Sequence, residues 1–475
     1  MQENKVKISD LMSKRIDPYY YNEEFQNLIK KLKQTKNICS VGTLIKSWNR
    51  GDGPREGFYT DDYQSGVPFI RINNLKQNSI DVSDIKYIYR NIHETRLKRT
   101  KVTANNLIFA ISGTKENLGT VAIIPDTIKE ANLNSALVRL DLDNLRISNK
   151  YFCVLFSSKF VRMQINYIGK GAAQNNLNNE EISQILIPVP SLDLQEQIVK
   201  IMSDANIKRQ EKYDNAKNLL ESINDILLKE LNIIIPKIDD KKEFKTTISN
   251  ILGSRLDPKY HQPKYETLAK YIKTNTKDLY SLEDICDEVI SGQRPKGGVS
   301  QVKEGIPSLG GEHVLRDGTI ETKNLKFIPE DFHKKQIKSK INPLDIILVK
   351  DGATTGKVGI IPEEYPFKEA NINEHVFILR CKKHINPYYI LAFLLSEIGQ
   401  TQIEREISGA TIMGITKDSL KNILIPLPSH NTQILIANEY NMRLEQAQNL
   451  KKEADKEFEK SKARVERIIL GEETL

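Results

Sequence analysis

Apolar and polar positions divide the chain into two repeated segments, each ending in a short apolar strand and a long helix. The strands are ILIPVPS from Ile185 and ILIPLPS from Ile423. Prolines after each apolar run cannot occupy a central strand or a helix interior, so they end the strand. About forty residues of helical pattern follow each strand. Ser191 or Asp193 is placed to cap the first of these helices.

Both long helices carry a heptad seam, in which apolar residues alternate at spacings of three and four. The seam of the second helix includes Tyr440 and Phe458, and the seam of the first has the same phase, with Met202 and Leu220 in the matching places. We expect the two helices, each about 60 Å long, to pair as an antiparallel coiled coil. The alternative is that each helix packs only on its own domain.

The remainder of the chain is repeated as well. ISDLMSKRIDPYYY from Ile8 returns as ISNILGSRLDPKYH from Ile248. FAISGTKENLGTVAIIP from Phe109 is answered by LVKDGATTGKVGIIP from Leu348, and both predict a hairpin that contains glycine. Shorter helices are expected near 22–34, 149–166, 263–274 and 387–404.

This repeat predicts an α/β (α+β) fold with two tandem mixed α/β domains, each followed by a long helix. A length of 475 residues agrees with several domains. The expected parts are a first domain with an N-terminal helical segment at 1–190, a first long helix at 191–232, a linker at 233–250, a second domain at 251–428 and a second long helix at 429–475.

Composition narrows the class of protein. The net charge of +8 permits nucleic-acid binding without demanding it. The start of the sequence lacks the apolar core of a signal peptide, and the longest apolar run is too short to span a membrane. The four cysteines are far apart in sequence, without a CxxC or Cys/His cluster, which argues against zinc and against a disulfide framework. We therefore expect a cytoplasmic protein with no metal site.

The sequence offers no convincing catalytic set. Asp17–Tyr20 is similar to the Asp-Pro-Pro-Tyr of amino-methyltransferases but lacks its second proline. Gly352–Lys357 is similar to a phosphate-binding loop, but Val358 stands where Ser or Thr should hold magnesium, so a hairpin turn is favoured. No nucleophile has an adjacent base. His313, His333 and His375 lack metal-ligand spacing, and His333 and its counterpart His93 are expected to be surface or packing residues.

Three places in each repeat combine glycine with basic or amide side chains. Arg, Asn and Gln pair with base edges, and Lys and Arg hold phosphates. The third place, GKGAAQNNLNN (169–179) against SGATIMGITKD (408–418), is the strongest candidate for base contacts. With the glycine hairpins included, the candidate DNA-binding residues are Lys46, Arg50, Arg55, Arg71, Asn73, Asn74, Lys115, Lys170, Gln174, Asn175, Asn176, Arg294, Lys296, His313, Lys350, Thr354, Thr355, Lys357, Thr411 and Met413.

With these stretches together, the sequence resembles the specificity subunits of type I restriction-modification systems over nearly its whole length. The resemblance rests on ILIPVPS and ILIPLPS before long helices, on VKDGATTGKVGII with its partner FAISGTKENLGTVAII, and on SGATIMGITKDSLKNI. SGQRPKGG from Ser291 is similar to the family's opening loop. The first repeat departs more from the pattern, with RGDGPRE from Arg50 and GKGAAQNNLNN.

The resemblance implies two target recognition domains that each read half of a split sequence in double-stranded DNA. The paired helices would act as a ruler and as a dock for two methyltransferase subunits. Those subunits would bring S-adenosylmethionine, and restriction subunits, where present, would use ATP and Mg. This chain would be a non-catalytic subunit without a cofactor of its own.

Three other readings stay open. The first is a two-component restriction-modification system, in which methylation and cleavage share one partner polypeptide. The second is a coiled-coil scaffold whose globular ends bind proteins instead of DNA. The third is an enzyme that acts alone.

Overall fold

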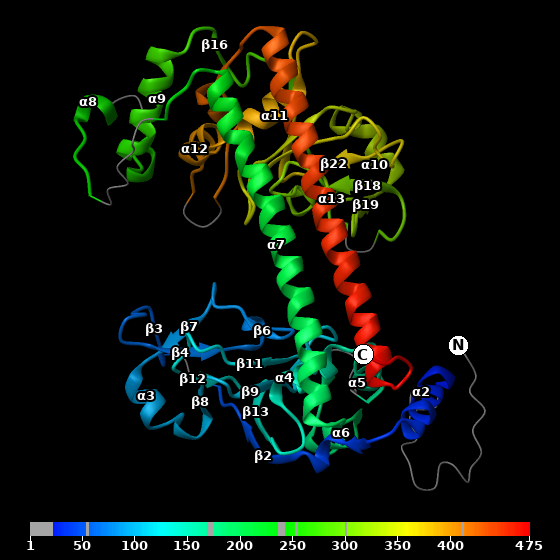
Figure 1. Ribbon diagram of the computed structural model, residues 1–475. Helices are drawn as coiled ribbons and strands as arrows, with labels where there is room; N and C mark the ends of the chain where they lie inside the picture. Colours follow the sequence, from blue (N-terminus) through cyan, green and yellow to red (C-terminus); the bar gives the residue numbers. More distant parts are fainter. Residues whose placement is uncertain are drawn as a thin grey trace. The chain divides into compact units, whose positions relative to one another are not determined.

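The computed structural model describes residues 22–53, 57–168, 175–235, 243–251, 255–299, 302–409 and 413–475. The chain forms two compact units (Figure 1). Unit 1 consists of Met1–Gln210 and Ala454–Leu475, and unit 2 consists of Glu211–Glu453. Each unit therefore contains one repeat together with a part of each long helix.

Unit 1 contains two larger sheets. The first is antiparallel, in the order β11 (Val121–Ile123), β9 (Leu107–Ala110), β13 (Leu137–Leu142) and β2 (Ile45–Arg50). The second has the order β3 (Tyr59–Thr60), β7 (Lys86–Ile88), β4 (Val67–Ile70), β12 (Glu130–Leu133) and β8 (Lys101–Thr103), with β4 and β12 parallel. Three small pairs are β1 (Ile38–Ser40) with β15 (Leu186–Pro188), β10 (Ser112–Gly113) with β14 (Asn175–Asn176), and β5 (Leu75–Lys76) with β6 (Ser79–Ile80).

The helices of unit 1 supply one wall of its core. They are α2 (Glu23–Gln34), α3 (Arg90–Glu94), α4 (Asn149–Ser157), α5 (Lys159–Ile168), α6 (Asn179–Ser183) and the first part of α7 (Leu192–Glu230), with 3-10 turns η2 (Val41–Thr43), η3 (Ile72–Asn74) and η4 (Lys98–Thr100). Strand β9 is buried on both faces. Phe109 faces a core that includes Phe152 and Phe156 of α4, whereas Ile108 faces a second core with Val102 and Ala131 of the other sheet. Unit 1 is thus layered as helices, sheet and sheet.

Unit 2 repeats this plan. Its antiparallel sheet has the order β17 (Cys286–Ser291), β23 (Val376–Cys381), β20 (Ile346–Val349) and β21 (Val358–Ile360), and its second sheet has the order β19 (Lys326–Ile328), β18 (Ile306–Leu309) and β22 (Asn371–Ile372). A small pair joins β16 (Leu279–Ser281) to β24 (Leu424–Pro426). The helices and turns are α8 (Ile248–Ile251), η5 (Pro258–His261), α9 (Pro263–Asn275), η6 (Gly311–His313), α10 (Glu330–Lys335), η7 (Ile337–Ser339), α11 (Pro387–Leu395), α12 (Glu397–Glu406), η8 (Asp418–Asn422) and α13 (His430–Ile469).

The mixed α/β character and the two glycine hairpins are confirmed, because β9 pairs with β11 and β20 with β21 as antiparallel neighbours. The single helices expected near 149–166 and 387–404 are wrong, since each is broken into two. Ser158 and Ser396 have extended backbones, so they end α4 and α11. The Ser158 hydroxyl then accepts a hydrogen bond from Val161 N, and the Ser396 hydroxyl accepts one from Gly399 N.

The same buried side chains hold each proline-ended strand. Tyr151 donates to the carbonyl of Pro188 at 3.1 Å, and Tyr389 donates to the carbonyl of Pro426. The amide of Gln164 exchanges two hydrogen bonds with the backbone of Leu186, both at 2.9 Å. Gln402 makes the same pair of bonds to Leu424. The strand is thereby fixed against the helices, although within the described residues it pairs with a single other strand.

Each long helix is anchored where it begins. Helix α7 starts at Leu192, and the Ser191 hydroxyl accepts from Leu194 N at 3.5 Å, so Ser191 is its cap and Asp193 lies inside the helix. The buried Gln195 accepts from Ser148 N and donates to the carbonyl of Pro190. Gln433 of α13 repeats this arrangement with Asn386 N and the carbonyl of Pro428.

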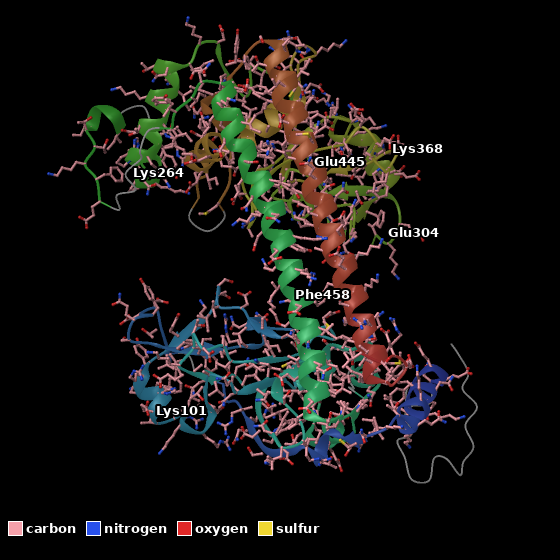
Figure 2. All side chains as sticks on the ribbon, in the orientation of Figure 1. Lys101, Lys264, Glu304, Lys368, Glu445 and Phe458 are labelled. Atoms are coloured by element: carbon pink, nitrogen blue, oxygen red, sulfur yellow. The ribbon has the colours of Figure 1, made fainter. Side chains whose placement is uncertain are left out.

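Side chains of α7 and α13 contact each other within both units. In unit 1, Arg209 pairs with Asp455 at 2.7 Å and lies 4.8 Å from the ring centre of Phe458. Phe458 is labelled in Figure 2. In unit 2, Lys212 pairs with Glu453 at 3.4 Å. Also in unit 2, the Arg443 guanidinium donates to the hydroxyl of Ser222 at 2.7 Å. Residues later in α7 therefore meet residues earlier in α13.

The structure also bears on the cysteines and on the apolar runs of the sequence. The four cysteines, Cys39, Cys153, Cys286 and Cys381, are free. Although they are far apart in sequence, Cys286 and Cys381 are direct cross-strand neighbours in β17 and β23. A hydrogen bond with Cys286, together with burial, raises the pKa of the Cys381 thiol. In the described part of the chain, every helix is too short or too polar to cross a bilayer.

Candidate nucleic-acid interface

In both units the glycine hairpin lies against the third candidate loop. In unit 1, β10 pairs with β14, so that Ser112 lies opposite Asn176. Leu177 N also donates to the carbonyl of Ile111 at 2.8 Å. These bonds bring the turn that carries the exposed Lys115 and the strand that carries the exposed Asn176 into one region.

Unit 2 makes the equivalent contact with different side chains. Ile415 N donates to the carbonyl of Lys350 at 2.7 Å, in the place of the Leu177–Ile111 bond. The hydroxyl of Thr355 donates to the carbonyl of Met413 at 3.2 Å, and the Met413 side chain is 47% exposed. Lys350, Thr355 and Met413, which are far apart in sequence, therefore belong to one surface.

A glycine lets the opening loop cross this surface in each unit. Gly51 follows β2, and a Cβ placed on it would lie 2.1 Å from the carbonyl oxygen of Asn134. Gly292 follows β17, and a Cβ there would lie 2.1 Å from the carbonyl oxygen of Asn373. Only glycine permits so close an approach of two backbones. The opening loop is thus held against the turn between the two sheets of its unit.

In unit 2, charged side chains from three loops form one cluster beside a hollow. Arg294 of the opening loop pairs with Glu374 at 3.1 Å. His375 contacts Glu374 at 3.3 Å through Nε2, and its Nδ1 bonds to Asp351 of the glycine hairpin. A hollow of about 770 Å³ is lined by Arg294, Glu374, His375, Glu312 and other residues. Hydrogen-bond donors and acceptors therefore lie together along this hollow.

Lys350 lies beside this cluster, because its backbone N–H donates to the carbonyl of His375 at 2.9 Å. Its Nζ donates to the hydroxyl of Ser291 at 3.0 Å and lies 5.4 Å from the ring centre of Phe377. Burial alone would raise the pKa of the Glu312 carboxyl. A bond from its own backbone amide and the charge of Lys326 outweigh the effect of burial, so the pKa lies below its usual value. The hollow therefore offers both anionic and cationic groups.

Sequence reasoning missed Asp351, Glu374 and Asn373, and of His375 it noted only that metal-ligand spacing is absent. Glu374 and His375 had one signal, the recurrence of EANLNSA as EANINEH, in which they replace Ser135 and Ala136 of unit 1. A change from small to charged residues inside a repeated motif marks a position that the fold does not constrain.

The second candidate place has a structural role in both units. Asn74 is 2% exposed, its Oδ1 accepts from Arg71 N, and its amide donates to the carbonyls of Asp81 and Asp84. His313 is 3% exposed and its Nδ1 accepts from Gly310 N. Both side chains stabilise a 3-10 turn, so we no longer assign them to DNA.

Arg71 and Lys46 also have partners within unit 1. The Arg71 guanidinium donates to the carbonyl of Asp84 at 2.7 Å and pairs with its carboxylate at 2.9 Å. Lys46 pairs with Asp143 at 2.9 Å, and this bond lowers the pKa of the Asp143 carboxyl. Lys46 lies at the opposite end of β2 from Arg50, so the structure does not bring these two candidates together.

Arg50 itself belongs to the interface region, because its Nε donates to the carbonyl of Ser135 at 2.9 Å. Asn73 and Lys296 are exposed, and Lys357 is half-buried. Thr354 turns inward and donates to the carbonyl of Gly311 at 3.2 Å. Five predictions lie outside what the structure describes, namely Arg55, Lys170, Gln174 and Thr411, together with the side chain of Asn175.

Comparison with known proteins agrees with this architecture. The family model described as "Type I restriction modification DNA specificity domain" matches residues 31–212 and 275–440. The type I restriction enzyme EcoKI specificity subunit of Escherichia coli is 26% identical over 423 residues, which are 88% of this chain and 83% of that protein. The MjaVIII specificity subunit of Methanocaldococcus jannaschii is 23% identical over 351 residues, covering 72% of this chain and 74% of that protein.

Among solved structures, the type I restriction-modification S subunit from M. genitalium covers 92% of this chain and 98% of its own, with 14% identity and a TM-score of 0.40. The family model matches twice, once in each repeat, and together the two matches span well over half of the sequence. The chain therefore belongs to the family of type I restriction-modification DNA specificity domains.

Proposed function

We propose that the two units bind the two halves of a split sequence in double-stranded DNA. The proposal rests on one observation: the two units have equivalent backbone contacts but different side chains at matching positions. Equivalent backbone bonds join the glycine hairpin to the third loop in both units. At matching places, unit 1 has Ser135 and Ala136 where unit 2 has Glu374 and His375. Two units of this kind would hold DNA alike and read different bases.

Binding would combine two kinds of contact. Exposed basic side chains such as Lys115, Lys296 and Arg50 would hold phosphates, which gives affinity that decreases with salt. Glu374, Asp351 and Met413 would contact base edges in unit 2. A carboxylate accepts hydrogen bonds from the amino group of cytosine, so this set would favour an amino-bearing base edge.

Helices α7 and α13 would fix the unread gap between the two halves. Their contacts, such as Arg209 with Asp455 and Lys212 with Glu453, support an antiparallel coiled coil. Each helix contributes residues to both units. A paired, continuous helix resists bending, and this stiffness is what a ruler requires.

The chemistry of modification would lie in partner proteins. Two methyltransferase subunits would bind the chain and use S-adenosylmethionine, and restriction subunits, where present, would use ATP and Mg. This chain would be non-catalytic, without a cofactor of its own in these reactions, and cytoplasmic. A single partner that fuses methylation with cleavage would need the same recognition chain, so the identity of the partner gene distinguishes the two systems.

Methylation mapping tests the proposal. The chain is co-expressed with its methyltransferase, and modified adenines are mapped across a host genome. The expected result is a split motif with a fixed gap. A continuous motif would mean that one unit alone reads DNA, and a stable complex without modification or salt-dependent DNA binding would favour the protein scaffold.

Paired substitutions make the test specific for each unit. The double change Glu374→Ser with His375→Ala gives unit 2 the residues of unit 1 and should alter only one half of the motif. The reciprocal change Ser135→Glu with Ala136→His is its matched control and should alter only the other half. A change in both halves from either variant contradicts independent reading.

A further inference from the structure

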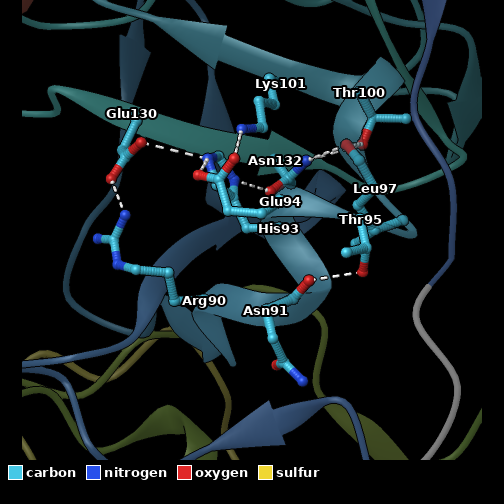
Figure 3. A network of polar contacts seen from close by, with 10 residues as sticks. All are labelled: Arg90, Asn91, His93, Glu94, Thr95, Leu97, Thr100, Lys101, Glu130 and Asn132. Carbon is cyan, nitrogen blue, oxygen red and sulfur yellow. Dashed lines mark hydrogen bonds and ion pairs between the residues drawn. The ribbon is translucent and has the colours of Figure 1, made fainter.

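A buried histidine of unit 1 has one ring nitrogen whose proton is fixed by its neighbours. His93 of α3 is fully buried, and its Nδ1 lies 2.5 Å from Asn132 Oδ1 (Figure 3). The Asn132 amide nitrogen donates to the carbonyl of Leu97 at 2.8 Å and to the hydroxyl of Thr100 at 2.9 Å. Asn132 Oδ1 must therefore be the atom that faces His93, and Nδ1 carries the proton that it receives.

The other ring nitrogen faces two carboxylates. His93 Nε2 lies 3.2 Å from Glu130 Oε2 and 3.6 Å from Glu94 Oε1. It has no hydrogen-bond partner among the described residues. In a neutral imidazole protonated at Nδ1, Nε2 presents a lone pair. Three electron-rich atoms then surround one point, and a cation at that point removes their repulsion.

Two basic side chains hold the carboxylates by their opposite oxygens. Arg90 bonds to Glu130 Oε1 at 2.7 Å, and Lys101 bonds to Glu94 Oε2 at 2.5 Å (Figure 3). The bond from Arg90 lowers the pKa of Glu130, and the bond from Lys101 lowers the pKa of Glu94. One oxygen of each carboxylate is therefore held by a basic side chain, and the other is left toward Nε2.

The spacing of the three atoms fits a tetrahedral metal ion. Zinc bonds to nitrogen and oxygen at about 2.0–2.2 Å, so two of its tetrahedral ligands are separated by roughly 3.3–3.6 Å. The distance from Nε2 to Glu94 lies at the upper end of this range and the distance to Glu130 is 0.1 Å below it, and all three donor atoms lie within 4.8 Å of one another. A histidine that binds zinc usually donates its other N–H to an oxygen, as His93 does to Asn132.

We infer that unit 1 binds one divalent transition-metal ion of the zinc class. The ligands are His93 Nε2, Glu94 Oε1 and Glu130 Oε2, and water completes the set. The ion ties α3 to strand β12. Sequence spacing gave no signal for it, because Glu130 lies on a strand far along the chain from the His-Glu pair.

Unit 2 supplies an internal control. His333 has the same surroundings, since its Nδ1 bonds to Asn371 and its Nε2 lies 3.4 Å from Glu369 Oε2. Lys334, however, occupies the position of Glu94. Only two ligands remain, and an added positive charge stands beside them. The chain should therefore bind one ion and not two.

The test uses the full chain after treatment with a chelator. Co²⁺ is titrated and its visible spectrum recorded, because tetrahedral Co²⁺ absorbs more strongly than octahedral Co²⁺; Zn²⁺ is then added to compete. One strongly absorbing ion per chain is expected. Glu94→Lys, which copies unit 2 at an exposed position, should lower the affinity by at least about 100-fold, because loss of a ligand should cost no less than loss of an outer-shell partner. Glu23→Lys on exposed α2 is the charge-matched control and should bind normally.

A second variant guards against loss by misfolding. Lys334→Glu supplies the missing ligand in unit 2 and should raise the count to two ions per chain. The inference is overturned if the wild-type chain gives no tetrahedral spectrum, or if Glu94→Lys binds as well as the wild type. The first outcome would mean that no tetrahedral ion is held by these three residues, and the second would mean that the ion is held elsewhere in the chain.

Discussion

Lengthening both long helices by one heptad should lengthen the DNA gap by about three base pairs. The insertion points are between Gln210 and Glu211 in α7 and between Glu453 and Ala454 in α13. Contacts on either side of these points, Arg209 with Asp455 and Lys212 with Glu453, lie within single units. Each unit therefore keeps its own contacts, and only the helix between them grows.

The magnitude follows from helix geometry. Seven residues at 1.5 Å each add about 10 Å, and base pairs are about 3.4 Å apart along the DNA axis. Seven residues also fall only about 20° short of two full helical turns, so the apolar seam still faces its partner. The insert should carry apolar residues in the heptad phase set by Met202 and Tyr440.

The assay selects bound DNA from a library in which the gap length varies, with the methyltransferase complex as the binding species. The wild-type chain and the variant should select gaps that differ by about three base pairs. An insertion in α7 alone is the control, because it displaces one helix against the other and should lower thermal stability. A variant that folds, modifies DNA and keeps the original gap would refute the ruler.

Four further changes test single features of the units. Gly51→Ala should weaken DNA binding because its Cβ meets the Asn134 carbonyl at 2.1 Å, whereas Gly53→Ala, with open space around it, should not. Arg380→Ala should cost about 3–5 kcal/mol in urea denaturation, because the buried Asp345 loses its bidentate partner. Burial raises the pKa of Asp345 in the folded state. The unfolded state therefore releases this proton first, so the free energy of unfolding should fall as pH rises just above the usual carboxyl pKa, and Asp345→Asn should remove that slope. Tyr389→Phe should cost about 1–3 kcal/mol by leaving the Pro426 carbonyl without its bond, whereas Tyr388→Phe is a neighbouring control.

The sequence was sufficient to predict the elements whose apolar residues recur at a short, regular spacing. Both long helices follow from their heptad pattern, and the hairpins at Phe109 and Leu348 follow from apolar runs that flank glycine. The repeat doubled this signal, since each element appeared twice with the same spacing. The local pattern wrongly predicted one continuous helix across Ser158 and another across Ser396. Each serine ends one helix and caps the next.

The candidate site was predicted less well, because exposure and partners are decided by contacts between distant residues. Asn74 and His313 have side chains suited to DNA, yet both are buried in turns that they stabilise. Asp351 gave no signal of its own, and only folding brings it to His375, which lies 24 residues further along the chain. The sequence by itself therefore determined the repeated architecture. Tertiary structure alone decided which polar side chains point outward, because burial depends on residues that the local pattern does not contain.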